Sequence, residues 1–458
     1  MSIAGYTKDT FGVQLNEVLS PSLPIRSPEN LKGREHELDL VERALFATGR
    51  HVFVFGARGV GKSSLAATAA FQYQSADAAP IFVSGATDET FRNIIANLVM
   101  QAVAKSRTEA HKRRHSASLS WHGLKIGTET EVTQLDIAAQ IQTTGDAVEL
   151  LKYVADTHSQ KPIVVLDEFD AIRDAQERNK FAGLLKQLGD QGVNIKFIFT
   201  GVGSSVEELI GAHASAFRQL ETRELPRLPW EARREIVENA AGAFGLSVDN
   251  NVNWRIAAVS DGFPHYVHLI AEKMLWEAFA EEAPTTELGT EHYQQGLRMA
   301  IESINVELKR PYEKAVIHRA MELEDVVWSS ADGEDLFRPL ADMHQSYRVV
   351  VGKRQDRQLL NRAKYSDLVR KLKTPGYGSV LEQLENRPGW YCYKEKMLRG
   401  YVRMQAEVNG VELSGERPIP RQKMHIASNA KTGVRGPTIP RGVDQNRPIR
   451  DESDQEEE

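Results

Sequence analysis

Short apolar runs alternate with amphipathic segments along the first half of the chain, and this alternation predicts strands joined by helices. The runs typical of buried strands lie at His51–Phe55, 81–83, 163–166, 195–199 and 222–225. Apolar residues at helical spacing lie between them, at 63–73, 91–104 and 180–191. Because each connection between parallel strands crosses over the sheet, the pattern favours a parallel sheet covered on both faces by helices.

Two segments around this core depart from the alternation. Residues 1–30 lack periodicity and are interpreted as an extended arm laid over the following domain. The core is expected at 31–228, with an insertion at about 104–145. The insertion is polar and is interpreted as a hairpin or as a partly disordered excursion.

Three further segments follow the core. Helical periodicity from 229 to 306 predicts a small helical lid. Residues 307–413 show helices, among them one at 380–385, and then a strand at 390–393, which is the order of elements in a winged helix. After residue 413 apolar residues become rare, so 414–458 are expected to form a disordered tail, first basic and then acidic.

Composition and charge exclude several classes of protein. The 458 residues include 57 Lys and Arg against 63 Asp and Glu, a formal charge of −6, but six of the acids lie in the last eight positions. The single cysteine, Cys392, excludes a disulfide framework and a cysteine-rich metal cluster. No basic-then-apolar leader and no run of the ~18–20 apolar residues of a membrane span occurs, so we expect a cytoplasmic protein without membrane contact.

A glycine-rich loop follows the strand His51–Phe55 and precedes a helical segment. Its residues match the spacing G-x-x-x-x-G-K-[ST] and run Gly56-Ala57-Arg58-Gly59-Val60-Gly61-Lys62-Ser63, with Ser64 next. Glycines let the backbone fold around a phosphate chain, and the following helix adds free N–H groups and its positive dipole end. We expect Lys62 to reach the β- and γ-phosphates of ATP and the Ser63 hydroxyl to bind Mg²⁺.

A second chemical signal is an apolar strand that ends in two carboxylates, Asp167 and Glu168. Parallel sheets bind ligands at the carboxyl ends of their strands, so Asp167 is expected to share the Mg²⁺ ion with Ser63. Glu168 is expected to orient or deprotonate the attacking water. The strand at 81–83 is expected to separate the strand of the glycine loop from this acidic strand.

The intervening strand together with Glu168 resembles the additional-strand, catalytic-glutamate division of P-loop ATPases. Asn30-Leu31-Lys32-Gly33-Arg34-Glu35 resembles the segment that precedes the glycine loop in AAA+ and STAND ATPases. Thr200 stands where the sensor-1 residue lies, and Gly262-Phe263-Pro264-His265 resembles a G-x-P motif of the lid. The chain is therefore similar to an AAA+/STAND-type P-loop ATPase of the initiator-like or archaeal-type branch, with a C-terminal winged helix.

The resemblance implies further residues of the site, each with an alternative. Arg218 lies where the family places an arginine finger that acts on a neighbouring subunit, and the alternative is a surface salt bridge. His265 lies at the helix start where the family commonly carries its sensor-2 arginine. Both a phosphate contact and an ordinary surface histidine are open for His265. The alternative for Thr200 is a polar residue that merely ends a strand.

A local excess of positive charge lies in the segment interpreted as a winged helix. Between 345 and 373 there are nine basic residues and two acidic ones. Basic residues beside a winged helix can neutralise DNA phosphates, and the candidates are Arg354, Arg357 and Lys371. The alternatives are a solvated face or a winged helix that docks on protein.

These patterns together predict an α/β P-loop NTPase with a helical lid, a winged-helix-like domain and a disordered tail. The predicted function is an ATP-binding and ATP-hydrolysing switch with Mg²⁺, coupled to assembly into a homo-oligomer and to DNA contact. The alternative is a nucleotide-controlled signalling or defence switch that binds an effector protein, with little turnover and no direct DNA binding.

Overall fold

The computed structural model describes residue 3 and residues 5–105, 119–121, 124–126, 133–203, 206, 218–354 and 357–413. Residues 1–416 form one compact unit. The tail expected at 414–458 and most of the insertion expected at 104–145 lie outside the described residues. Within that insertion, the described strands β3 (Leu119–Trp121) and β4 (Leu124–Ile126) pair in an antiparallel manner.

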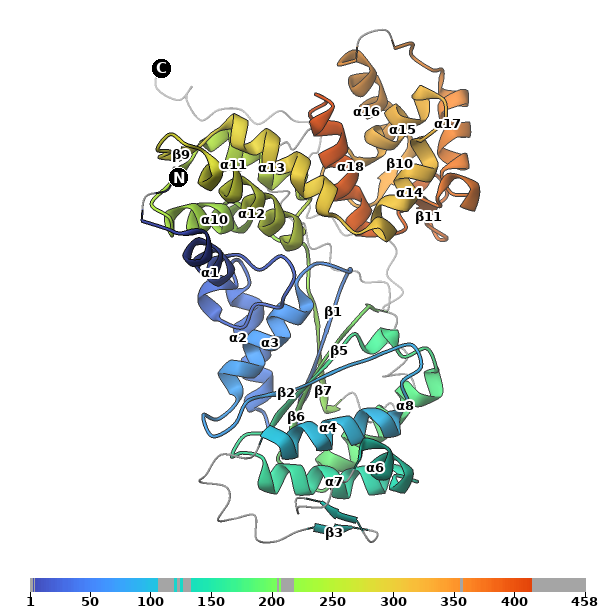
Figure 1. The fold of residues 1–458 in the computed structure, drawn as a ribbon. Helices are drawn as coiled ribbons and strands as arrows, with labels where there is room; N and C mark the ends of the chain where they lie inside the picture. The colour runs from blue at the N-terminus through green and yellow to red at the C-terminus, as the bar shows by residue number, and fades with distance from the viewer. Residues whose placement is uncertain are drawn as a thin grey trace, which may run out of the picture. The chain divides into compact units, whose positions relative to one another are not determined.

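The predicted parallel sheet is confirmed (Figure 1). Its strands are β1 (His51–Phe55), β2 (Ile81–Ser84), β5 (Ile163–Asp167), β6 (Lys196–Gly201) and β7 (Leu220–Glu224), in the order β2-β5-β6-β1-β7. The expectation that the second strand separates the glycine-loop strand from the acidic strand is wrong. In the sheet β2 is an edge strand and β6 lies between β1 and β5, because crossover connections let strands far apart in sequence become neighbours.

Helices cover both faces of the sheet, and alternate residues of each strand face them (Figure 1). In β1, Val52 and Val54 pack with α2 (Glu35–Phe46) and α3 (Lys62–Tyr73). Phe53, between them, packs on the other face, in the apolar cluster to which α4 (Phe91–Lys105), α6 (Gln134–Gln140), α7 (Thr144–Thr157) and α8 (Ala175–Asp190) contribute. The run of apolar residues therefore reflects a strand buried on both sides.

A helical region follows β7, at the place where a lid is predicted. It consists of α10 (Trp230–Gly242), α11 (Asn250–Val259), α12 (Pro264–Ala280) and α13 (Thr290–Ser303). The short strands β8 (Ser247–Val248) and β9 (Glu287–Leu288) pair in parallel beside them. Pro264 is the first residue of α12, a position where its missing N–H costs no hydrogen bond.

The C-terminal described region combines helices with a small antiparallel sheet. The helices are α14 (Val306–Val316), α15 (Met321–Ala331), α16 (Leu340–Gly352), α17 (Arg362–Lys371) and α18 (Lys396–Val408). The sheet has the order β10-β12-β11, from β10 (Arg338–Pro339), β11 (Leu381–Gln383) and β12 (Trp390–Tyr393). The helix expected at 380–385 is therefore wrong, because these residues pair with β12 and long-range pairing overrides a short local pattern.

The sequence pattern predicts an extended arm over the first thirty residues, but part of this segment is helical in the structure. Residues Lys8–Val18 form α1, whose first turn is capped by reciprocal hydrogen bonds between Thr7 and Thr10. Phe11 is fully buried by the aromatic rings of Phe244 and Phe279. The sequence pattern did not predict this helix because only two of its residues, Phe11 and Leu15, are buried apolar residues.

The chain after α1 lies across two helices of the unit. The Ser20 N–H donates to Nδ1 of His268 on α12 at 3.3 Å. Farther along, the Ile25 N–H donates to Ser64 at 3.1 Å and its carbonyl accepts from Thr68 at 3.1 Å, both on α3. This segment therefore links the lid to the helix that follows the glycine loop.

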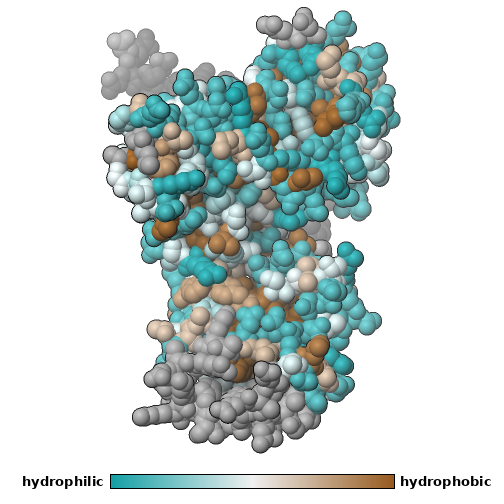
Figure 2. Space-filling view, viewed as in Figure 1, coloured by the Kyte–Doolittle hydropathy of each residue, from teal (hydrophilic) through white to brown (hydrophobic). Residues whose placement is uncertain are grey.

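Hydrophilic residues cover most of the face shown in Figure 2, and apolar residues appear there in small scattered groups. None of the helices in the described part of the chain combines the length and the apolar character needed to span a bilayer.

The contact between Ser20 and His268 predicts that acid releases the arm. Burial, with a smaller contribution from His265, lowers the pKa of His268 to about 4, so the native ring is neutral and accepts the Ser20 N–H. The contribution of the neutral ring to the free energy of unfolding is fully present above the unfolded pKa of about 6.5. It is lost as pH falls toward 4, a difference of about 3 kcal/mol.

Hydrogen exchange at 19–26, corrected for intrinsic rates, is expected to rise over this range. His268→Gln should abolish the step, and a step that persists in this variant would contradict the assignment.

Candidate nucleotide site

The glycine loop has the backbone conformation that its sequence predicts. Gly56, Gly59 and Gly61 have positive φ angles of 152°, 78° and 99°, which glycine adopts without strain. A Cβ at Gly56 would lie 2.6 Å from the Leu225 carbonyl oxygen, so only glycine fits between the two strands. The loop leads directly into α3 at Lys62, which places free helix N–H groups at its end.

Lys62 lies folded over its own loop. Its Nζ donates to the carbonyl oxygens of Gly56 at 3.2 Å and Ala57 at 2.9 Å. Burial lowers the pKa of Lys62, and the carboxylates of Asp170, Asp167 and Glu168 partly offset that shift. The ammonium group is thus held in the concavity of the loop, where a phosphate would replace the two carbonyls as its partner.

Ser63 and Asp167 meet as expected for ligands of one cation. The Ser63 hydroxyl donates to Asp167 Oδ1 at 2.9 Å, although 104 positions separate the two residues. A hydroxyl and a carboxylate are hard oxygen ligands that suit Mg²⁺, which keeps waters and binds substrate phosphates in its other positions. Among the described residues, no group of three or more His, Cys, Asp or Glu is arranged to hold a metal alone. The donors therefore fit Mg²⁺ that arrives with a nucleotide.

Thr200, from the neighbouring strand β6, belongs to the same cluster. Its hydroxyl donates to Asp167 Oδ1 and accepts the backbone N–H of Glu168 at 3.1 Å. The side chain is only 1% exposed, and its hydroxyl contacts the two residues at the end of β5. It orients the carboxylate and the turn that carries Glu168.

Glu168 occupies a left-handed backbone conformation, with φ of 54° directly after β5. Such a conformation costs a non-glycine residue free energy and persists only where surrounding contacts impose it. The contacts here are the N–H bonds of Glu168 to Asp167 and Thr200. They turn the chain sharply, so that Glu168 directly follows Asp167 at the carboxyl end of the sheet.

Gly85 and Arg34 support this arrangement, and neither is assigned a role by the sequence pattern. The Gly85 N–H donates to the Asp167 carbonyl at 2.8 Å, and a Cβ there would lie 2.4 Å from the Glu168 carbonyl oxygen. Arg34 is buried and donates to the carbonyls of Val60 at 3.0 Å and Pro226 at 2.6 Å. Burial lowers its pKa to about 10, where it is still charged at neutral pH. The close approach at Gly85 becomes visible only when two strands pair.

The structure keeps Arg218 away from the glycine loop of its own chain. Arg218 precedes β7, and the first residue of β7, Leu220, pairs with His51 at the opposite end of β1 from the loop. The strand is five residues long, which separates the two ends by about 16 Å. The exposed side chain therefore starts far from the glycine loop of its own chain.

His265 is held by the N-terminal arm, since its Nδ1 lies 2.8 Å from the Pro21 carbonyl oxygen. The residue beside it approaches the loop instead: a Cβ on Gly61 would lie 3.6 Å from Cγ of Pro264. The start of the lid helix therefore borders the glycine loop through proline.

The arm also borders the metal ligands. A cavity of about 180 Å³ is lined by Pro24 and Arg26 of the arm together with Ser63, Ala67, Phe82, Val83, Ser84, Val165 and Asp167. The Arg26 guanidinium lies over the rings of Phe71 and Phe82, at 5.5 and 5.7 Å from their centroids. The N-terminal arm thus adds a cation to the surroundings of the site, a contribution that its sequence did not suggest.

Two of the three residues predicted to contact DNA are engaged inside the protein. Arg354 donates to Glu324 at 2.8 Å and Asp325 at 2.6 Å. Arg357 lies 3.5 Å from the same aspartate. Lys371, at the end of α17, is exposed. The local count of charges was misleading because the neutralising acids come from α15, outside the basic segment.

The close contact at Gly85 predicts a specific defect in hydrolysis. Gly85→Ala would push a Cβ into the Glu168 carbonyl, shift the turn that positions Glu168 and lower kcat by about 100-fold, with little change in nucleotide affinity. Steady-state ATPase rates and fluorescent-nucleotide titration measure the two effects. Gly242→Ala is the control, because a Cβ there meets nothing within 4 Å. Equal losses of kcat and affinity would contradict the assignment.

Comparison with known proteins agrees with this geometry. The family model described as "AAA ATPase domain" matches residues 30–198. No curated protein has significant sequence similarity to the chain.

Solved structures with similar chain traces include three archaeal proteins. The Walker-type ATPase PABY2304 of Pyrococcus abyssi has a TM-score of 0.47 and 15% identity, over 83% of this chain and 98% of that chain. Cdc6p from Pyrobaculum aerophilum has a TM-score of 0.43 and 16% identity, over 87% and 99%. The Aeropyrum pernix ORC2 protein has a TM-score of 0.45 and 14% identity, over 86% of this chain and 98% of that chain. Residues 30–198 thus match the family model of an AAA ATPase domain.

Proposed function

We propose that the chain binds ATP with Mg²⁺ and hydrolyses it to ADP and phosphate. The observation that carries the proposal is the cluster in which Asp167 Oδ1 accepts hydrogen bonds from Ser63, Thr200 and the Glu168 N–H. A glycine loop alone accounts for phosphate binding. The cluster adds a cation site and a carboxylate beside it, which hydrolysis requires.

Each residue of the site has a separate role in this proposal. The loop 56–61 and the start of α3 bind the phosphates through N–H groups, and Lys62 supplies a positive charge to them. Ser63 and Asp167 hold Mg²⁺, which neutralises charge on the β- and γ-phosphate oxygens when bound. The Thr200 hydroxyl fixes the orientation of the Asp167 carboxylate and of the turn at Glu168 through its two hydrogen bonds. Glu168 accepts a proton from the attacking water or orients it.

A homo-oligomer is part of the proposal because of Arg218. This exposed residue lies at the end of the sheet opposite the glycine loop, so it completes a site only in a neighbouring subunit. A planar guanidinium that enters from a neighbour stabilises charge on the transferred phosphoryl group. Assembly would then control turnover.

The carboxylate of Glu168 provides the direct test of the chemistry. Glu168→Gln removes the base but preserves size and hydrogen bonding, so ATP is expected to stay bound while kcat falls at least ~100-fold. Bound nucleotide after mixing with ATP is measured by quench and chromatography. The matched control is Glu149→Gln on α7, an exposed residue paired with Lys152. Turnover unchanged in Glu168→Gln would refute the role of this residue.

Contact with DNA through the C-terminal region is the second part of the proposal. Its support is the exposed surface of α17, which carries Arg362, Lys364, Arg370 and Lys371, and the exposed Arg387 between β11 and β12. Helices followed by a small antiparallel sheet are the arrangement of a winged helix, in which one helix enters the major groove.

Charge reversal on this helix tests the contact. The variant Lys364→Glu with Lys371→Glu should weaken duplex DNA binding and reduce the slope of log K against log salt concentration by about 2. It should also reduce any stimulation of ATPase turnover by DNA. Arg43→Glu with Lys152→Glu, both exposed on other helices, is the control. If DNA alters neither mobility nor turnover of the wild-type protein at low salt, the DNA part is wrong.

A further inference from the structure

A methionine from the C-terminal region packs on the glycine loop. Met397, in the first turn of α18, is 9% exposed. A Cβ placed on Gly59 would lie 2.3 Å from Met397 Sδ and 2.9 Å from its Cγ, so the thioether lies directly against the backbone of the loop. More than three hundred residues separate the two in sequence. The outer side of the phosphate-binding loop is therefore covered by a residue that lies beyond 30–198.

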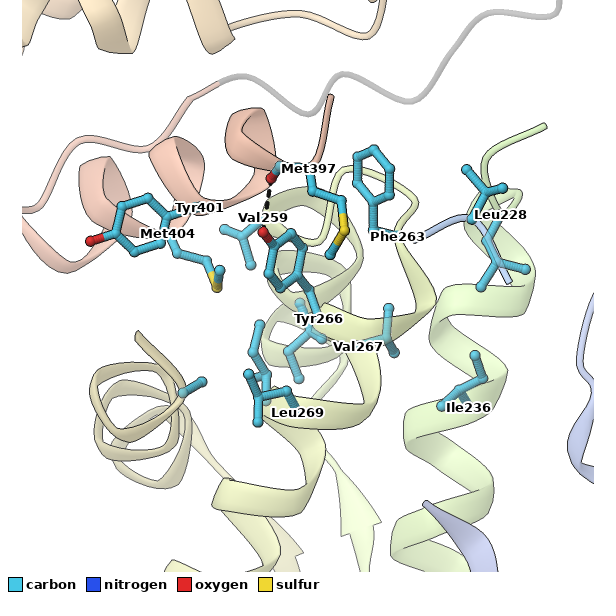
Figure 3. Packing of buried hydrophobic residues seen from close by; sticks show 14 of the residues in the cluster. Leu228, Ile236, Val259, Phe263, Tyr266, Val267, Leu269, Met397, Tyr401 and Met404 are labelled. Atoms are coloured by element: carbon cyan, nitrogen blue, oxygen red, sulfur yellow. Dashed lines mark hydrogen bonds between the residues drawn. The ribbon is translucent and has the colours of Figure 1, made fainter. Parts of the chain in front are cut away.

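The lid holds this methionine in place. The Tyr266 hydroxyl donates to the Met397 carbonyl at 2.8 Å, and Figure 3 shows the Met397 side chain between Phe263 and Tyr266. A Cβ on Gly400 would lie 2.6 Å from the Tyr266 ring, so α18 approaches α12 as closely as a glycine permits. Pro264 at the start of α12 lies beside Gly61, and Met397 of α18 lies beside Gly59. The lid and α18 therefore both contact the glycine loop.

A buried aspartate of the lid contacts both α18 and the segment that precedes the lid. Asp261, fully buried and with φ of 52°, lies 2.5 Å from Arg227, 3.6 Å from Arg399 and 3.5 Å from Arg403. Arg227 precedes the lid, and the other two arginines are on α18. The four arginines around it, with Arg233 the fourth, lower the pKa of Asp261 although burial raises it. One carboxylate is therefore the counter-charge for several buried guanidinium groups.

The arginines use their remaining donors on backbone carbonyls. Arg403 donates to Ala258 at 2.8 Å and to Ala331 at 2.9 Å, which ties α11 to α15 through α18. At the far end of α18, Glu407 pairs with Arg255 at 2.5 Å and accepts from Tyr293 at 3.0 Å. Burial lowers the pKa of Arg399 to about 9, still above neutral pH. Without Asp261, the buried Arg399 and Arg403 and the half-buried Arg227 would lose their carboxylate partner, and such a loss weakens packing strongly.

We propose that Met397 is a positioning residue of the nucleotide site, and that the Asp261–arginine cluster holds it on the loop and so controls nucleotide release. This inference rests on the proposed function, since it assumes that nucleotide phosphates occupy the glycine loop. Phosphates bound by the N–H groups of 56–61 lie against backbone that Met397 covers. Release then requires α18 to move from Gly59, and movement of α18 strains its contacts with Tyr266 and Asp261.

The experiment measures the release of a fluorescent ADP, N-methylanthraniloyl-ADP, from the full-length protein by stopped-flow chase with unlabelled ADP. Met397→Ala is expected to raise the dissociation rate constant about tenfold, equivalent to ~1.4 kcal/mol. Met397→Leu, which keeps the bulk, should remain within about twofold of the wild type. Met321→Ala, a truncation of an exposed methionine, is the control and should not change the rate.

Asp261→Asn provides the second, independent variant. It keeps the size of the side chain, removes the counter-charge and is expected to raise the dissociation rate constant in the same direction as Met397→Ala. Thermal unfolding of each variant separates this effect from misfolding, because a folded variant retains a cooperative transition. If Met397→Ala binds the ADP probe, folds, and releases it at the wild-type rate, the inference is overturned. If the wild-type protein binds no ADP, the proposed function fails instead.

Discussion

The site depends on one carboxylate oxygen at the end of a buried strand. Asp167 Oδ1 accepts from Ser63 on α3, from Thr200 on β6 and from the Glu168 N–H, so three separately formed elements converge on a single atom. Each hydrogen bond to a charged carboxylate contributes about 1.5–3 kcal/mol net. Their joint geometry matters more, because it places a hydroxyl, a carboxylate and a second carboxylate at the edge where parallel sheets bind ligands. The strained φ of Glu168 is maintained by the same bonds.

Two segments distant in sequence, the N-terminal arm and α18, contact the elements around this centre. The N-terminal arm is hydrogen-bonded to Ser64 and Thr68 on α3 and to His268 on α12, so it spans the gap between core and lid. From the other end of the chain, α18 reaches Gly59 through Met397 and reaches Asp261 through two arginines. Both termini of the unit therefore contact the elements that flank the glycine loop. Movements of either segment and changes at the loop are physically coupled through these contacts.

Much of the core was predictable because its signals are local and agree with one another. The apolar runs identify strands, and the loop spacing together with the carboxylates at the end of the acidic strand predicts candidate phosphate and cation sites. The errors have a common origin in contacts between distant residues. The order of β2 and β6 depends on crossover geometry, and α1 is stabilised by the rings of Phe244 and Phe279. Arg354 and Arg357 are neutralised by acids on α15, which no count within their own segment includes.

The sequence alone predicted a candidate phosphate and cation site at the carboxyl edge of the sheet, because glycine, lysine, serine and two acids at those spacings follow a local rule of strand, loop and helix. It also determined that the strands are parallel and buried on both faces. Only the tertiary structure showed that Pro264 and Met397, the latter from beyond residues 30–198, lie close to the loop, and that His265 contacts the Pro21 carbonyl. It also decided that Gly85 must lack a side chain and that Arg218 lies near the end of β1 opposite the glycine loop. These are distances between elements, and a one-dimensional pattern contains no information on them until the elements have packed.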